Sequence, residues 1–491
     1  MNRKLSLVFL ILLLLQLSLL LIFIFFRHID ADEGTYLMFA YQVAENKLPY
    51  FDFFYPQMPY LPYFYAPFSH LGFSSLFWGR AFSALLCLLT SLLLYYLMFR
   101  LTNNQKLALA TFFLYVFNSL TLNWHSVIKT YALSDLFGLL SFAFLVFSLL
   151  NSNNRAGYTF LAGLFIGLAF NCRLTFLSIF CLELLATLLF FRRKLISSTS
   201  LVVGAIFSSV GSIYLLLKDA DIFLFNNWWY HQLWGTGVIK MGFLGKLFVF
   251  LKFISYPQNL FILILALITC IYISKNREHS KTAPVLFKTQ LVALGFCVIF
   301  ILLAFLPNPS QFQYYQHTIP YLLIFSVPPL GQLLNWLERR RFFTFVGSLL
   351  YLLGLIPFML VFVFAVRSQD KIFKINQVRE VVEVIQENST KGDHILSFWN
   401  GYIVLSQRKL LSGNYTWDHT VTPLLSKQQI KRFNLLDRED VNATISSCKP
   451  TLIIDINDQF YQFFPNLKEY YLVLKDSGEV KIYVQGERCK K

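Results

Sequence analysis

Three carboxylates stand together directly after the first apolar run of the chain. Asp30, Asp32 and Glu33 lie within the stretch "FFRHIDADEGTYLMF", residues 25–39. Clustered carboxylates repel one another where water is scarce, so they favour binding a cation, deprotonating a substrate hydroxyl, or both. The alternative is a hydrated loop that is acidic because basic residues are retained elsewhere. That alternative does not explain why the cluster abuts the apolar run, and we interpret it as functional.

The stretch that follows the carboxylates predicts a cavity rim. Residues 41–72, "YQVAENKLPYFDFFYPQMPYLPYFYAPFSHLG", hold five prolines and many Tyr and Phe rings. Proline interrupts helices, so this stretch cannot be a plain membrane span. It suits short helices that lie along the outer leaflet. An ordinary aromatic belt would account for the rings but not for the length of the excursion.

The composition identifies the class of protein that carries these residues. The chain has 491 residues, of which 56% are hydrophobic and 14% are charged, whereas about 25% charged residues is usual in soluble proteins. Repeated apolar runs of about 18 residues or more indicate a polytopic membrane protein. The first run, 5–26, exceeds a signal-peptide core and lacks a cleavage site, so we expect a retained span. The net charge of +16 is spread in short clusters rather than on one basic face, which excludes nucleic acid as a partner.

The apolar runs predict about 11 transmembrane helices. Their ranges are 5–26, 76–99, 107–122, 131–150, 159–174, 176–191, 199–217, 247–274, 284–306, 315–337 and 342–366. With the N-terminus inside, the even-numbered connections carry the basic stretches "FRLTNNQK", "NSNNR", "FRRK", "SKNREHSK" and "ERRR". This alternation follows the positive-inside rule. It predicts a transmembrane domain over 1–367, with the acidic loop 27–75 and the C-terminal tail on the outer side.

The tail, residues 368–491, has the pattern of a soluble α/β domain. "IFKINQVREVVEVIQEN" has helical spacing, "TLIIDI" reads as a buried strand, and "YYLVLKDSGEVKIYV" reads as a hairpin. Cys448 and Cys489 both lie in this tail, and the sequence leaves open whether they pair.

The order of several short motifs resembles the GT-C superfamily of membrane glycosyltransferases. In the branch of protein O-mannosyltransferases and lipid A aminoarabinose transferases, the first span ends in an Asp-Glu pair, as in Asp32-Glu33-Gly34-Thr35-Tyr36. The other matching stretches are "KLPYFD" (47–52), "YPQMPY" (55–60), "KTY" (129–131) with Asp135, "AGLFIGLAFNCRLTFL" (162–177) and "FQYYQHTIPYLLIF" (312–325). Together they cover most of residues 1–340. This is a resemblance in the order and placement of the motifs, since none of them is specific alone.

The resemblance implies a hexosyl- or pentosyltransferase that takes its sugar from a polyprenyl-phosphate donor on the outer face. Asp32 would be the principal catalytic carboxylate, with Glu33 supporting it; Asp30 is additional to the usual pair. A second acidic residue in the next outer loop is common in the superfamily, but residues 118–129 contain none. A divalent cation (Mg, Mn or Zn) therefore stays open, with Asp32 and Glu33 as its ligands if it is present.

A lipid-phosphate leaving group needs cations near the outer leaflet. The candidates for binding the donor phosphate are Arg173, Lys129, Lys218 and His317. For the two lysines, snorkelling at a helix end is an equally good explanation. The candidates for lining the substrate cavity are Tyr36, Asp52, Tyr55, His125, Asp135, His231, Tyr314 and Tyr315.

The acceptor is not readable from the sequence, and a protein, a lipid or a cell-envelope glycan are all open. We expect a bacterial inner-membrane protein whose active site and C-terminal domain face the periplasm. The alternative function is a transporter or flippase of lipid-linked saccharides. That function needs ionisable residues within the membrane, for which only Asp135, Glu183 and Arg173 qualify.

Overall fold

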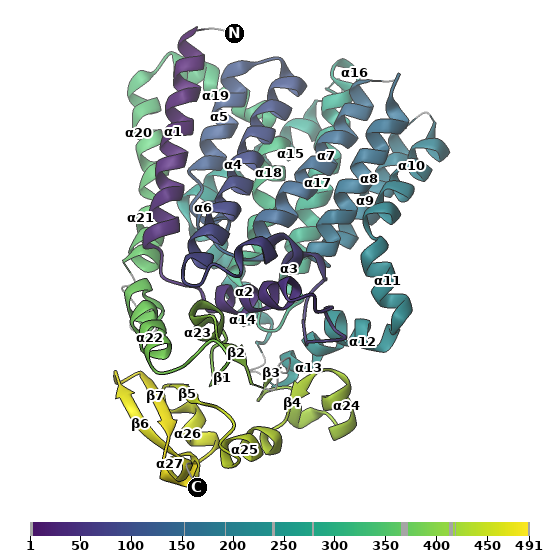
Figure 1. Cartoon of the computed structure of the whole chain (residues 1–491). Coiled ribbons are helices and arrows are strands. Elements are labelled where there is room, and N and C mark those ends of the chain that lie inside the picture. Colours follow the sequence, from purple (N-terminus) through teal and green to yellow (C-terminus); the bar gives the residue numbers. More distant parts are fainter. Residues whose placement is uncertain are drawn as a thin grey trace.

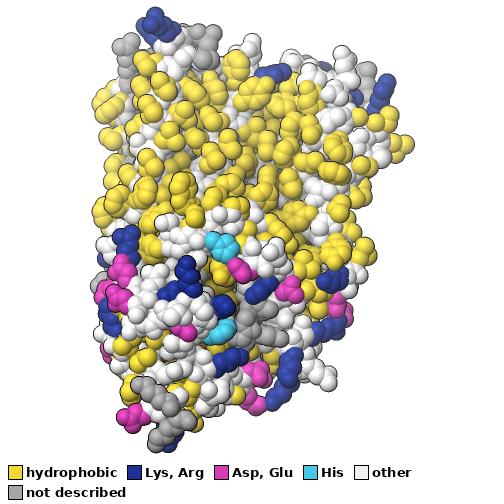
Figure 2. All heavy atoms as spheres, viewed as in Figure 1, with side chains coloured by type: hydrophobic (Ala, Val, Ile, Leu, Met, Phe, Trp, Pro, Cys, Tyr) yellow, Lys and Arg dark blue, Asp and Glu magenta, His cyan; other side chains and the backbone are white. Residues whose placement is uncertain are grey.

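The computed structural model shows a bundle of long helices with a mixed α/β region at one end (Figure 1). It describes residues 3–151, 153–191, 193–237, 241–276, 279–364, 372–411, 416–417 and 419–489. The predicted boundary between the two parts, at 367 and 368, lies outside these residues. Apolar side chains cover the middle of the bundle as a broad band, and most charged side chains lie beyond it (Figure 2). This band is the surface of an integral membrane protein.

Among the described residues, six helices or helical stretches are long and apolar enough to cross a membrane. They are α1 (Arg3–Phe26), α4 (Ser74–Thr102), α7 (Thr130–Leu150), α15 (Pro257–Lys275), α17 (Pro284–Phe305) and the stretch Phe342–Val363, which comprises most of α20 (Arg341–Leu353), α21 (Ile356–Phe358) and η4 (Met359–Val363). A seventh candidate is the pair α10 (Lys194–Ser208) and α11 (Val210–Lys218), which is bent by 65°. The polytopic helical architecture is therefore confirmed.

Several of the other predicted spans are built from shorter helices. They comprise α5 (Gln105–Val116), α6 (Ser119–Trp124), α8 (Arg155–Cys172), α9 (Phe176–Phe190), η3 (Phe312–Thr318), α18 (Ile319–Phe325) and α19 (Val327–Glu338). The predicted span 247–274 is divided into α14 (Phe243–Ser255) and α15, because Pro257 opens a new helix after Tyr256 turns to an extended conformation. The count of eleven spans stays a prediction.

Short helices cross the end of the bundle that faces the α/β region, which we call the α2 end (Figure 1). They are α2 (Ala31–Ala44), α3 (Tyr60–Tyr65), η1 (Ala66–Phe68), α12 (Ala220–Leu224), η2 (Phe225–Trp229) and α13 (Tyr230–Gly237). The N-terminus and α16 (His279–Thr282) lie at the opposite end (Figure 1). An ion pair between Lys106 and Glu338 joins two of the basic connections at that opposite end.

The C-terminal α/β region, residues 372–489, is built on a five-stranded sheet in the order β2-β1-β5-β7-β6. Its strands are β1 (His394–Ser397), β2 (Lys409–Leu410), β5 (Leu452–Ile456), β6 (Tyr471–Asp476) and β7 (Val480–Gln485); β3 (Thr416–Trp417) and β4 (Leu435–Leu436) form a separate pair. The predicted strand in "TLIIDI" is β5, and the predicted hairpin is β6–β7, with Gly478 at φ +83° in its turn.

The strands of this region are accompanied by helices, and a disulfide closes its C-terminal end. The helices are α22 (Ile375–Glu387), α23 (Gly401–Ser406), η6 (Thr422–Leu424), α24 (Lys427–Arg432), α25 (Arg438–Ser446), α26 (Gln459–Phe463), α27 (Leu467–Tyr470) and η7 (Glu487–Cys489). Cys448 and Cys489, whose pairing the sequence left open, form a disulfide. One hydrophobic cluster contains Leu37 of α2 and Leu76 of α4 together with Val378 of α22 and Ile403 of α23. The bundle and the α/β region therefore share a core.

Candidate functional site

The first turn of α2 fixes the three carboxylates through a capping box. Asp30 is the N-cap residue, and its Oδ1 accepts the backbone N–H of Asp32 at 3.0 Å. In return, Oε2 of Glu33 accepts the backbone N–H of Asp30 at 2.9 Å. The spacing of Asp30 and Glu33 is thus that of a reciprocal helix cap. It starts α2 at the end of the bundle and sends the side chains of Asp32 and Glu33 to different surroundings.

Glu33 lies in a fully buried ion pair. Its Oε1 accepts from Arg80 Nε at 2.8 Å and its Oε2 accepts from Arg80 Nη2 at 2.6 Å. Arg27 Nη1 lies 3.8 Å from Oε2, and the backbone N–H of Ile128 donates to Oε1 at 3.2 Å. Burial would raise the pKa of Glu33, but the charge and hydrogen bonds of Arg80, together with Arg27, hold it below its usual value. Glu33 is therefore not presented to a substrate.

Arg80 was not predicted from the sequence, although the sequence carries a sign of its role. Arg80 is fully buried in α4, and a basic residue within a predicted apolar span needs a partner. Its guanidinium also donates to three backbone carbonyls, those of Ile24, Arg27 and His28. Arg80 thereby ties the end of α1 to the start of α2.

Lys129 joins the two aspartates. Its Nζ lies 2.8 Å from Asp30 Oδ1 and 2.8 Å from Asp32 Oδ2. The side chain of Asp30 is 16% exposed, whereas that of Asp32 is 62% exposed. Burial would raise the pKa of Asp30, but Lys129 and Arg27 hold it below its usual range. Asp32 is thus the one carboxylate of the three that is largely open to solvent.

Arg173 lies beside this group at the end of α8. Its Nη1 donates to Thr130 Oγ1 at 2.8 Å, and its guanidinium lies 4.6 Å from the ring centre of Tyr131 and 5.4 Å from that of Tyr314. Within the described ranges it forms no ion pair with a carboxylate. Burial raises the pKa of Tyr36, Asp32 raises it further, and Lys129 and Arg173 act against it. The charged groups of Asp32, Lys129 and Arg173 therefore lie close together around Tyr36.

The N-terminus of α7 lies in the same neighbourhood. This 21-residue helix begins at Thr130, and its N-cap residue, Lys129, makes no side-chain capping bond. The first N–H groups of a helix carry a partial positive charge that favours anions. With Lys129 and Arg173 beside it, this helix end is a suitable place for a phosphate.

His125, Asp135 and His317 form a closed cluster inside the bundle. Asp135 Oδ2 lies 2.7 Å from His125 Nε2, and its Oδ1 contacts His317 Nδ1. All three side chains are buried. The ring of His317 packs 5.6 Å from that of Tyr131, on which Arg173 also rests. His317 is therefore a paired residue behind the site rather than an isolated cation at its surface.

The remaining candidates lie farther around the rim. Lys218 Nζ lies 4.2 Å from the ring centre of Phe51, and Asp52 Oδ2 accepts the backbone N–H of Leu48 at 2.6 Å. Two further candidates are buried among rings: Tyr55, 4.9 Å from Phe39, and Tyr315, 4.9 Å from Phe253. His231 lies on α13, close enough to Arg173 for the positive charge of Arg173 to lower its pKa.

The donor set does not fit a metal held by Asp32 and Glu33. Both oxygens of Glu33 are engaged by Arg80, and an ammonium group, Lys129, bridges Asp32 to Asp30. Across the part of the chain that the structure describes, no group of three or more His, Cys, Asp or Glu side chains is placed to hold a metal ion. We derive no step through a metal.

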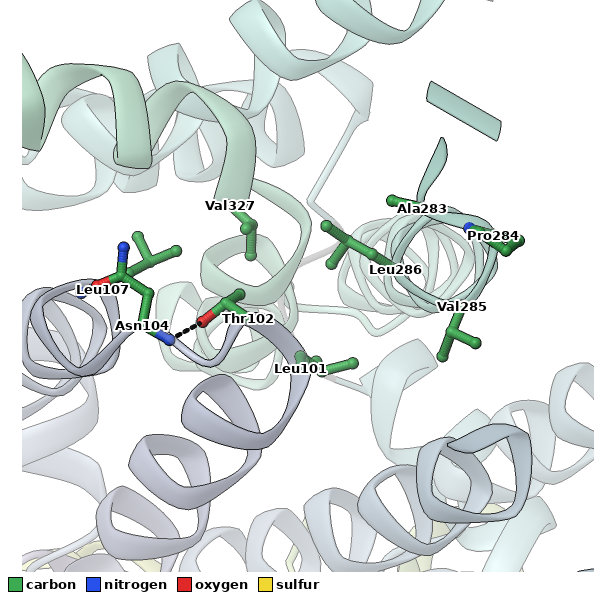
Figure 3. A pocket seen from close by; sticks show the side chains of 9 residues that line it. All are labelled: Leu101, Thr102, Asn104, Leu107, Ala283, Pro284, Val285, Leu286 and Val327. Atoms are coloured by element: carbon green, nitrogen blue, oxygen red, sulfur yellow. Dashed lines mark hydrogen bonds between the residues drawn. The ribbon is translucent and has the colours of Figure 1, made fainter. Parts of the chain in front are cut away.

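A pocket of about 430 Å³ lies away from these residues, between the start of α17 and the junction of α4 and α5 (Figure 3). Leu101, Leu107, Leu286 and Val327 give it mainly apolar walls, and none of the described residues that line it is charged. The charged site at α2 is distinct from this pocket.

Comparisons with known proteins agree with this architecture. The family described as dolichyl-phosphate-mannose-protein mannosyltransferase matches residues 56–215. The crystal structure of ArnT from Cupriavidus metallidurans bound to undecaprenyl phosphate has a TM-score of 0.69 at 12% identity, covering 97% of this chain and 98% of that one. Its apo form has a TM-score of 0.66.

A second solved structure is similar over the whole of this chain. It is the archaeal oligosaccharyltransferase AglB from Archaeoglobus fulgidus, in complex with an inhibitory peptide and a dolichol-phosphate. Its TM-score is 0.53 at 13% identity, covering 99% of this chain and 74% of that one. A search of curated proteins finds no match to this chain. ArnT and AglB both have the GT-C architecture, so the resemblance inferred from the motifs is confirmed at the level of the fold.

Proposed function

We propose that this protein transfers a sugar from a polyprenyl-phosphate donor to an acceptor hydroxyl at the α2 end of the bundle. The observation that carries the proposal is the meeting of an exposed carboxylate, Asp32, with Lys129, Arg173 and the N-terminus of α7. A base and an anion site side by side are what glycosyl transfer from a lipid phosphate requires. The matches to ArnT and to the mannosyltransferase family favour this function over transport.

Asp32 acts as the general base in this proposal. Its exposed oxygen takes the proton of the acceptor hydroxyl while the acceptor oxygen attacks the anomeric carbon of the sugar. The bond from that carbon to the phosphate oxygen breaks, and its electron pair leaves with the lipid phosphate. Lys129, 2.8 Å from Asp32 Oδ2, fixes the position of the carboxylate.

Arg173 binds the donor phosphate, together with the N-terminus of α7. Lys129 already bridges two carboxylates, so Arg173 is the better placed of the two to meet a phosphate charge. Tyr36, Tyr131 and Tyr314 surround it and would line the space for the donor. His317 supports Tyr131 from behind, and a direct role for Lys218 stays a prediction.

The positions of Asp135, Glu183 and Arg173 argue against a transporter, which needs ionisable residues within the membrane. Asp135 contacts two histidines, and Glu183 is fully buried with Ser141 Oγ 2.8 Å from its Oε1. Arg173 lies at the α2 end rather than at mid-membrane. These groups form closed contacts and not a polar path across the bundle.

The α2 end would face the periplasm of a bacterial inner membrane, with 1–367 as the catalytic domain and 368–491 as the exported one. The basic connections belong to the other end, as the positive-inside rule requires. The Cys448–Cys489 disulfide suits an oxidising compartment.

The test uses the full chain in nanodiscs with a polyprenyl-phosphate donor that carries a labelled sugar. We expect polyprenyl phosphate to be released as labelled sugar appears on an acceptor fraction from cell envelopes. Movement of intact donor between the leaflets of liposomes, without release of polyprenyl phosphate, would show that the protein is a flippase.

A further inference from the structure

Trp399 of the C-terminal α/β region reaches the turn that carries Asp32. Its indole N–H donates to the carbonyl oxygen of Ala31 at 2.7 Å, across a separation of 368 residues. Ala31 lies between Asp30 and Asp32, so this bond holds the backbone at the carboxylate pair. The Trp399 side chain is buried, and its ring packs against Phe373 and Tyr402. A buried indole in a fixed position is a rigid support.

The chain that leads into α2 is held from the same side. The backbone N–H of Ile29 donates to the carbonyl oxygen of Phe373 at 2.7 Å, and that of His28 donates to Phe362 at 2.9 Å. Phe373 lies two residues before α22, and Phe362 lies in η4, within the candidate membrane stretch Phe342–Val363. The entry to α2 is thus bonded both to the start of the C-terminal α/β region and to the bundle.

Helices α2 and α23 approach each other through two glycines. A Cβ atom on Gly34 would lie 2.5 Å from Gly401 Cα and 2.5 Å from the Trp399 ring. Real Cβ contacts do not come this close, so α2 and the Trp399 ring fit together only because residue 34 has no side chain. The fit leaves little room for the first turns of α2 to shift.

Two further bonds attach the α/β region to the loop that follows α2. Gln407 Nε2 donates to the Ser69 carbonyl oxygen at 3.2 Å, and Asn434 Nδ2 donates to that of Tyr50 at 2.9 Å. The C-terminal α/β region therefore contacts the loop 27–75 at separate points along that loop. An appended domain on a flexible linker would not be attached in this way.

We propose that Trp399 is a positioning residue for Asp32, and that the C-terminal α/β region is needed for the transfer reaction through this contact. The proposal rests on the proposed function. Lys129 holds the Asp32 carboxylate from the bundle side, and Trp399 holds the backbone next to it from the other side. A shift of about 1 Å in a reacting group can lower a rate by about 10²-fold, so a looser α2 lowers turnover without weakening the hold on the donor phosphate.

Trp399→Phe tests this contact, since it keeps an aromatic ring but removes the indole N–H donor and part of the ring that packs against Gly34. We expect kcat to fall about tenfold, while KM for the polyprenyl-phosphate donor stays within about twofold. The matched control is Trp336→Phe in α19, at the opposite end of the bundle, which should leave both constants unchanged. Both variants are measured as full chains in nanodiscs.

Hydrogen exchange provides a readout that does not depend on sugar transfer. In Trp399→Phe, peptides that cover residues 29–40 should exchange faster than in the wild type, and peptides from α17 should not change. A normal kcat, or a reduced kcat with unchanged exchange at 29–40, would overturn the proposal. If the wild type transfers no sugar, the proposed function fails, and the exchange result alone still decides whether Trp399 holds α2.

Discussion

The first turn of α2 has two sides, each with an acidic side chain. One side is buried against the bundle and the other is exposed to solvent. On the bundle side, Glu33 is 0% exposed and both its oxygens are bonded to Arg80. On the solvent side, Asp32 is 62% exposed and shares Lys129 with Asp30. These two carboxylates are adjacent in the sequence. The comparison teaches that one acidic motif can hold the fold with one residue and expose the next to solvent.

The two sides differ in what a lost charge would do. On the bundle side, two buried arginines depend on Glu33, so its removal leaves positive charge without compensation. On the solvent side, water can replace the missing interaction, so the loss of a charge affects chemistry more than folding. Variants of each side should therefore separate stability from activity.

The largest loss of stability should come from Glu33→Gln. This change keeps the shape of the side chain but leaves Arg80 buried without its anionic partner, while Arg27 keeps only Asp30, 4.0 Å from its Nη2. Breaking a buried pair in this way costs about 3–5 kcal/mol. The measurement is the thermal unfolding midpoint and the folded yield of the purified full chain in detergent. Asp32→Asn is the matched control and should unfold near the wild-type temperature; equal unfolding midpoints for all three proteins would show that the two sides are not different.

A smaller effect, on donor binding, is expected from Arg173→Gln. Loss of a charge-assisted hydrogen bond to phosphate costs about 1.5–3 kcal/mol, which is about 10- to 100-fold in affinity. We expect KM for the polyprenyl-phosphate donor to rise by this factor. Arg155→Gln, at the other end of the same helix, is the control. An unchanged KM would remove Arg173 from the donor site.

The pH dependence of stability should show the pairing of Asp30. Its pKa is held below the usual value in the folded protein, so its contribution is present above the unfolded pKa of about 3.9 and is lost as pH falls through the folded value. We therefore expect the unfolding temperature to fall as the pH is lowered below about 4. Asp30→Asn should flatten this fall, and an identical slope in the variant would contradict the assignment.

The smallest effect is expected from Lys218→Met. Its ammonium group rests on the ring of Phe51, and its position at the end of α11 fits snorkelling at the membrane surface. Turnover and donor KM should stay within about twofold of the wild type. A large rise in KM would extend the donor site to this side of the rim.

The sequence predicted those features that local patterns encode. Apolar runs and basic connections predicted a polytopic membrane protein, and the acidic cluster predicted a site at the end of the first span, which stays a prediction. The spacing of Asp30 and Glu33 is also a helix-capping pattern. Because both residues belong to an acidic cluster, the sequence suggested only a catalytic or cation-binding role for them. That pattern, with Arg80 in the next span, was the available sign that Glu33 serves the fold.

Contacts between distant residues could not be predicted in the same way. His317 meets Asp135 across 182 residues, and Trp399 meets Ala31 across 368. No local pattern states which histidine faces which carboxylate, because helix packing decides it. For the same reason the sequence offered His317 as a separate cation, whereas the structure pairs it inside the bundle.

The most direct test of the account is the turnover of Asp32→Asn in nanodiscs with a labelled polyprenyl-phosphate sugar. The change removes the charge of the exposed carboxylate and keeps its size. The account predicts that turnover falls by about 10²–10⁴-fold, the contribution of a positioned base, while donor KM and the unfolding temperature stay near those of the wild type. Near-normal turnover would contradict the central claim and would leave Asp32 as a solvated side chain at the rim of the bundle.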